Sequence, residues 1–121
     1  MTGPPFDRQR SGGYGWLVDP ALDHEYMAAI ADVAHLLATH HLAAGEPALA
    51  ETAAQVAVNA GSSADTLLLD LVAASDAMGN TAEADAYEKR IMANHDAEVE
   101  EDLPPRTAEI LRRRRWLLAR L

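Results

Sequence analysis

The sequence predicts an all-α protein of about five helices, and three observations support that fold class. Hydrophobic residues make up 49% of the 121 residues but aromatic residues only 5%, so the core must consist mainly of alanine, leucine and valine, which favours closely packed helices. Apolar residues recur at steps of three and four between proline and glycine signals, which is the helical period. No segment alternates apolar and polar residues long enough to predict a strand. A chain of this length supports one hydrophobic core.

The organisation predicted along the chain is an irregular lead-in over residues 1–18 and a helical domain over residues 19–121. Four glycines and the Pro4-Pro5 pair interrupt the lead-in. Its apolar residues are expected to pack on the helical body, and they are Phe6, Tyr14, Trp16 and Leu17.

The first helix is predicted from Asp19-Pro20 up to Gly45, and the second from Glu46-Pro47 to about Ala60. In each case a proline stands at the first helical position, and a glycine ends the helix. The first helix is expected to bury an apolar face made of Leu22, Tyr26, Ile30, Val33 and Leu37.

Three further helices follow. The third is predicted to start at Ser62, in a capping box with Asp65, and to end at Gly79. The fourth starts at Asn80, and Ala84, Tyr87 and Ile91 lie on one of its faces. Pro104-Pro105 opens the fifth, whose apolar residues are Ile110, Leu111, Leu117, Leu118 and Leu121.

A 34-residue repeat gives the arrangement of these helices. Gly45 and Gly79 are 34 residues apart, as are Ala50 and Ala84, and this period is that of the tetratricopeptide repeat. The two repeats span Ala31–Ala64 and Asp65–Glu98, with Leu37 and Leu71 at matching core positions. We therefore expect tetratricopeptide-like hairpins with a C-terminal capping helix.

The run from Gly79 to Arg113 resembles the end of the bacterial transcriptional activator domain, the helical domain of Streptomyces-type antibiotic regulatory proteins. The residues that match its pattern are Gly79, Ala82, Glu83, Ala84, Ala86, Tyr87, Glu101, Pro105 and Thr107. The upstream part is similar to versions in larger actinobacterial proteins, some with LysM segments. The resemblance implies a tetratricopeptide-like module for transcription regulation that belongs to a larger protein. The family's winged helix has no counterpart here, so no DNA-contacting residue carries over.

The net charge of −9 is unevenly distributed. Residues 106–121 contain six arginines and Glu109, which makes this segment +5 and the remainder −14. An acidic body repels a phosphate backbone, so nucleic-acid binding through Arg112–Arg115 is the less favoured alternative. We expect these arginines to meet acids of the same chain or of a second copy, and a separate acidic partner is an alternative that is favoured over nucleic acid.

No residue pattern predicts an enzyme, a cofactor or a metal site. His35, His40 and His41 lack the three- or four-residue spacing of helical metal ligands. The serines have no nucleophile elbow, and the acids from Glu98 to Asp102 do not form a calcium loop. There is no cysteine, no secretory signal and no apolar stretch of the roughly 18 residues needed to span a membrane, so a cytoplasmic location is expected.

A non-catalytic interaction module is the predicted function, with a self-associating regulatory domain as the alternative. The candidate partner groove is predicted to be small and weakly acidic, which suits a peptide or a helix with some basic character. It consists of Asp32, His35, Thr39, Thr66, Leu69, Ala73 and Asp76. In an equally weighted alternative, these residues are buried against the lead-in or the fifth helix.

A second candidate interface lies at the C-terminus, where the fifth helix is expected to dock on the second repeat or on another chain. Ile110, Leu117 and Leu121 should form the docked face, with the leucines setting affinity and the arginines orientation. Its candidate residues are Arg112, Arg113, Arg114, Arg115, Trp116, Leu117 and Leu121.

Overall fold

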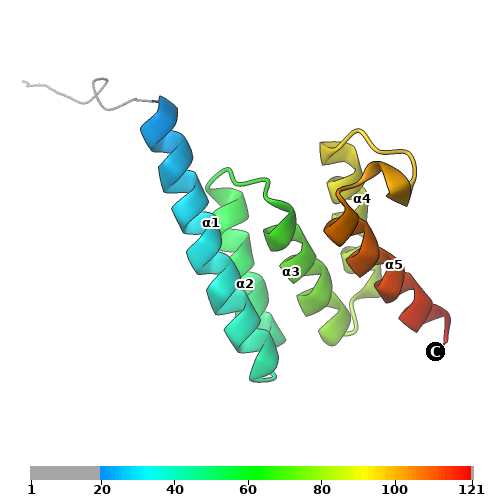
Figure 1. The fold of residues 1–121 in the computed structure, drawn as a ribbon. Helices are drawn as coiled ribbons and strands as arrows, with labels where there is room; N and C mark the ends of the chain where they lie inside the picture. The colour runs from blue at the N-terminus through cyan, green and yellow to red at the C-terminus, as the bar shows by residue number, and fades with distance from the viewer. Residues whose placement is uncertain (1–19, 121) are drawn as a thin grey trace, which may run out of the picture. The chain divides into compact units, whose positions relative to one another are not determined.

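The computed structural model describes residues 20–120, with side chains from residue 25 onward (Figure 1). Its elements are α1 (Pro20–Ala43), α2 (Pro47–Asn59), α3 (Asp65–Ala77), α4 (Thr81–Asn94), the 3-10 turn η2 (Glu100–Asp102) and α5 (Pro105–Ala119). Every regular element within residues 20–120 is helical, which confirms the all-α prediction. None of these helices is both long and apolar enough to cross a membrane.

Two parts of the chain are described separately, residues 1–30 and residues 31–121. In the first part, the structure describes only the opening turns of α1. Several of the sequence predictions lie outside the described residues. They concern the lead-in with its four apolar residues, Asp19, the side chain of Leu22, and Leu121. The contacts reported below all lie within residues 31–120.

The two glycines of the repeat end α1 and α3 in the same way. Gly45 and Gly79 have φ angles of 76° and 81°, in the left-handed region that glycine enters without steric cost. In each case the next amide donates to the carbonyl five residues earlier at 2.8 Å (Glu46 to His41, Asn80 to Ser75). Both ends are therefore Schellman motifs, and this part of the repeat has one local structure.

The third helix begins at Asp65 with Ala64 as its N-cap, two residues after the predicted N-cap Ser62. Ser62 belongs instead to the end of α2, where its backbone N–H donates to the carbonyl of Ala57 at 3.1 Å. Its hydroxyl accepts from the N–H of Ala64 at 3.4 Å. The expected capping box of Ser62 and Asp65 does not form, because Ser62 already completes the preceding helix.

Small side chains form the core between α2, α3 and α4. Ala50 and Ala54 of α2, Ala74 of α3 and Ala84 of α4 are fully buried. Alanine extends no further than Cβ, so it permits the close packing of these helices. Larger side chains fill the rest of the core, and the fully buried ones are Leu67, Leu68, Leu71, Ile91 and Leu111.

The predicted core face of α1 is wrong within residues 31–43. Val33 and Leu37 are 57% and 46% exposed, whereas Ala31, Ala34 and Ala38 are buried. The alanine stripe packs inward because it allows a closer approach, and each residue further along a helix is turned by about 100°. Leu37 is therefore not a core counterpart of Leu71.

Candidate functional site

α5 packs on its own chain through a mixed stripe of polar and apolar side chains. Leu111 is fully buried, and Thr107, Ala108 and Arg114 are nearly so. Ile110 and Leu117, which were expected to form the docked face, remain 40% and 53% exposed. The form of that expectation that docks them on the second repeat is wrong, because Arg114, one turn after Leu111, points inward to Asp76, Asp85 and Glu88 instead. Their exposure leaves Ile110 and Leu117 available for the other form, docking on another chain.

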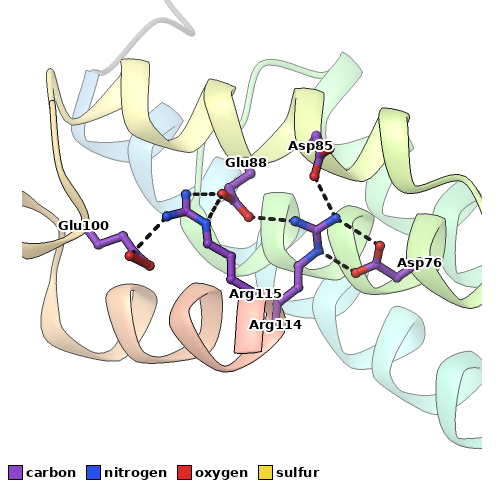
Figure 2. Close-up of polar contacts among 6 residues, drawn as sticks. All are labelled: Asp76, Asp85, Glu88, Glu100, Arg114 and Arg115. Atoms are coloured by element: carbon purple, nitrogen blue, oxygen red, sulfur yellow. Dashed lines mark hydrogen bonds and ion pairs between the residues drawn. The ribbon is translucent and has the colours of Figure 1, made fainter. Parts of the chain in front are cut away.

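Arg114 lies at the centre of an ion-pair network that joins α5 to α3 and α4 (Figure 2). Its Nε and Nη2 donate to the two carboxylate oxygens of Asp76 at 2.6 and 3.1 Å. Nη2 also donates to Asp85 at 2.9 Å, and Nη1 donates to Glu88 at 2.8 Å. The hydrogen bond with Asp76 above all raises the pKa of Arg114, so this side chain stays cationic.

Arg115 extends the network toward the acidic segment before α5. Its Nε donates to Glu88 Oε1 at 2.8 Å, and its Nη2 contacts the same oxygen. Its Nη1 lies 3.1 Å from Glu100 Oε1 in η2. Glu88 therefore accepts from both arginines while its side chain is only 9% exposed. The contact with Glu100 is where an arginine of the run meets the acids of residues 98–102.

A second polar cluster ties the beginning of α5 to the beginning of α3. The hydroxyl of Thr107 donates to Asp65 Oδ2 at 3.0 Å. His95, the residue that caps the end of α4, places Nε2 2.8 Å from the same oxygen. Since Asp65 begins α3 and Asp76 lies near its end, these contacts hold α3 and α5 parallel, as Figure 1 shows.

An apolar groove of about 440 Å³ opens between α3 and α5. Leu69 and Ala73 line it from α3, and Ile110 and Leu117 line it from α5. Arg113 is the exposed cation among its lining residues. The Asp65–Thr107 contact lies one helical turn before the groove, and the Asp76–Arg114 pair forms part of its lining.

Three of the seven residues predicted to line a partner groove line this one, namely Leu69, Ala73 and Asp76. Asp32, Thr39 and Thr66 are exposed and do not line it. His35 instead places Nδ1 2.6 Å from Oδ2 of Asp70 in α3. Burial raises the pKa of Asp70, and the hydrogen bond from His35 opposes that effect.

The C-terminal candidate residues fall into two groups. Arg114 and Arg115 are held by carboxylates of the same chain, whereas the others within residues 20–120 are exposed. The exposed group consists of Arg112, Arg113, Trp116 and Leu117. The sequence therefore placed four arginines in one interface, while the structure divides them between two faces of α5.

Sequence reasoning missed the acids that receive Arg114, and Glu88 in particular. A signal for it exists: Ala84, Glu88 and Ile91 follow one another at helical steps of four and three, and all three are buried. An acid within an apolar stripe predicts a buried cation on a neighbouring helix. Arg114 occupies the equivalent place in the stripe of α5.

A polar hollow between α2 and α4 contains a further group of titratable side chains. Tyr87 donates its hydroxyl to Gln55 Oε1 at 3.2 Å, and Glu51 and Glu83 lie beside it. Burial, followed by repulsion from Glu83, raises the pKa of Glu51. The hollow is also lined by Thr52, Val56 and Asn59, so its polar groups are carboxylates, amides, a hydroxyl and a phenol.

Within residues 20–120, no group of three or more His, Asp or Glu side chains is arranged to hold a metal ion. The titratable side chains of the Arg114 network and of the Asp65 cluster join helices to one another. No family model, curated protein or solved structure matches this chain.

Proposed function

We propose that this chain is a non-catalytic protein-interaction module that binds a helix or peptide in the groove between α3 and α5. The groove itself supports this function, because Leu69, Ala73, Ile110 and Leu117 form one apolar lining that is open to solvent. Partner helices insert their apolar faces into grooves of this composition. Exposed apolar patches on soluble proteins are also typical of binding sites.

The proposal includes a tetratricopeptide-like arrangement and a role in transcription regulation within a larger cytoplasmic protein. The 34-residue repeat and the parallel course of α3 and α5 support the arrangement. Several residues that match the bacterial transcriptional activator domain have defined structural roles here. Ala84 is fully buried, Pro105 begins α5, and Thr107 bonds Asp65.

Self-association is the second candidate function. The observation that favours it is the exposure of Trp116 and Leu117 on the outer side of α5, because two copies could cover these side chains. Nucleic-acid binding has less support, since the guanidinium groups of Arg114 and Arg115 are paired with carboxylates of the same chain. Arg112 and Arg113 are exposed, and Arg115, although its side chain is 46% exposed, is paired with Glu88 and Glu100.

Peptide titration with a groove-filling variant tests the proposed function. The probes are amphipathic helical peptides of about 14 residues, long enough to form several turns, with leucines at i, i+3, i+4 and i+7 and with acidic, neutral or basic outer faces. Ala73→Phe fills the groove. Ala77→Phe is the matched control, since Ala77 is exposed on α3 and does not line the groove.

We expect fluorescence anisotropy to detect binding of at least one peptide, and Ala73→Phe alone to abolish it. The proposal is wrong if no peptide binds, or if both variants bind equally well. Sedimentation of the unliganded chain addresses the second candidate: a dimer that Trp116→Ala dissociates would favour self-association through the outer side of α5, and one that Ala73→Phe dissociates would favour self-association through the groove.

A further inference from the structure

The cations of the described chain are concentrated on one helix. Five of the eight Lys and Arg residues within 20–120 lie on α5, and a sixth, Arg120, is its C-cap residue; Glu109 is the single acid of the helix. Arg114 and Arg115 meet carboxylates of α3, α4 and η2. The other four are exposed and give the outer face of α5 a net charge of +3 together with Glu109; they are Arg106, Arg112, Arg113 and Arg120.

This basic face is continuous with the apolar groove. A second hollow, of about 580 Å³, lies on α5 and is lined by Glu109, Arg112, Arg113, Trp116 and Leu117. Arg113 and Leu117 also line the groove between α3 and α5, so the two hollows form one surface. The guanidinium of Arg120 lies 4.7 Å from the centre of the Trp116 ring and adds a cation at its far end.

Among the residues that line the groove, Arg113 is the charged side chain that no lining carboxylate pairs with. Asp76 also lines the groove, but the two-pronged contact with Arg114 neutralises it. A partner that enters the groove therefore meets apolar side chains and a positive edge. We propose that the ligand of this groove is an acidic amphipathic helix of another protein, an inference that rests on the proposed function.

The apolar residues of such a helix would lie against Leu69, Ala73 and Leu117, and its carboxylates would face Arg112 and Arg113. The rest of the chain repels this ligand, because residues 1–105 carry a charge of −14. Complementary charge on one face and like charge elsewhere steer a partner to that face. The charge distribution thus determines both the partner's sign and where it docks.

Two other occupants fit this surface less well. A two-fold dimer through α5 places the same patch of each copy against the other, so two faces of charge +3 would meet. A phosphate backbone would lie over Ile110 and Leu117, which offer it no hydrogen bond, and next to a strongly acidic body. An acidic amphipathic helix satisfies the apolar and the basic side chains together.

The test compares three peptides that share the leucine pattern described above and differ only in outer residues: glutamate, glutamine or lysine. Binding is measured by fluorescence anisotropy at low and at physiological salt, with the full chain. The charge-reversed variant is Arg112→Glu combined with Arg113→Glu. Arg90→Glu, which reverses an exposed arginine on α4, is the control, and circular dichroism checks that every variant is folded.

We expect the glutamate peptide to bind about tenfold more tightly than the glutamine peptide at low salt, and the lysine peptide to bind least. The double variant should remove this preference or reverse it, and Arg90→Glu should retain it. If glutamate and glutamine peptides bind equally and Ala73→Phe blocks both, the inference is overturned and the proposed function stands.

Three other results overturn the inference. If no peptide binds, the proposed function fails together with it. Salt-dependent binding of duplex DNA that the double variant abolishes would assign the surface to nucleic acid. A concentration-dependent dimer that Ala73→Phe dissociates would assign it to a second copy of this chain.

Discussion

Replacing Arg114 by methionine should cost more stability than any other single change to an arginine within residues 20–120. The substitution keeps a long apolar side chain but removes four hydrogen bonds to Asp76, Asp85 and Glu88. Breaking one side of a buried ion pair costs about 3–5 kcal/mol. We expect about 3 kcal/mol, because Asp85 is 55% exposed and returns to water, and Glu88 keeps Arg115.

Urea denaturation followed by circular dichroism measures this loss as a lower midpoint with an unchanged slope. Arg113→Met is the matched control, since Arg113 is the exposed neighbour on the same helix; its effect should stay within about 0.5 kcal/mol. A double-mutant cycle with Glu88→Gln should give a coupling of about 1 kcal/mol or more. If Arg114→Met destabilises no more than Arg113→Met, the network does not hold α5 in place.

Three further changes test other parts of the fold. Leu111→Ala removes a fully buried side chain and should cost about 2–5 kcal/mol in urea denaturation, whereas Leu117→Ala, at an exposed position, should change the midpoint little. Gly79→Ala should cost about 1–2 kcal/mol from its φ of 81° alone; an added Cβ meets no atom within 4 Å, so Gly79→Asn, which tolerates this conformation, should lower the melting temperature less. Burial raises the pKa of Asp70 above its ordinary 3.8, so the folded state holds this proton more tightly, and the contribution of Asp70 to stability falls as pH rises from 3.8 through the raised value. Asp70→Asn cannot ionise, and its stability relative to the unmodified chain should therefore increase over that interval; a constant difference across acidic pH would contradict this reasoning.

Local signals were sufficient to predict the helices. Proline starts and glycine ends depend on the backbone of a few neighbouring residues, and Pro47 and Pro105 do begin α2 and α5. The exception, Ser62, shows the limit of such signals, because one serine can serve either the end of a helix or the start of the next. Its use at the end of α2 moved the start of α3 to Asp65.

Burial was harder to predict, because it depends on which partner each helix face meets. Hydrophobicity alone favoured Leu37 and Leu117 over Ala34 and Arg114, and in both helices the residue with less apolar surface is the buried one. Ala34 is buried because a small side chain allows two helices to approach closely. Arg114 is buried because carboxylates of neighbouring helices pair with its guanidinium group. Those partners lie 26 to 38 residues away in the sequence, and no local pattern pairs them.

Only the α3 wall of the candidate groove was predicted from the sequence, because the α5 wall depends on a tertiary contact. Leu69, Ala73 and Asp76 follow from the register of the repeat, which is a property of α3 alone. The opposite wall, with Ile110 and Leu117, depends on how α5 is rotated by Arg114. The sequence contains the charges that set this rotation, but their pairing is a tertiary contact.

The contacts of Asp65 with Thr107 and of Asp76 with Arg114 have a consequence for the speed of binding. They fix the separation of α3 and α5 at two points, so the groove is open before a partner arrives. The partner helix proposed for this groove would then meet a preformed receptor, and its association would need no prior opening step. Binding should follow a single exponential whose rate rises linearly with partner concentration, at about 10⁵–10⁷ M⁻¹s⁻¹. Thr107→Val removes one of the two attachments, and a slow, concentration-independent phase should then accompany binding.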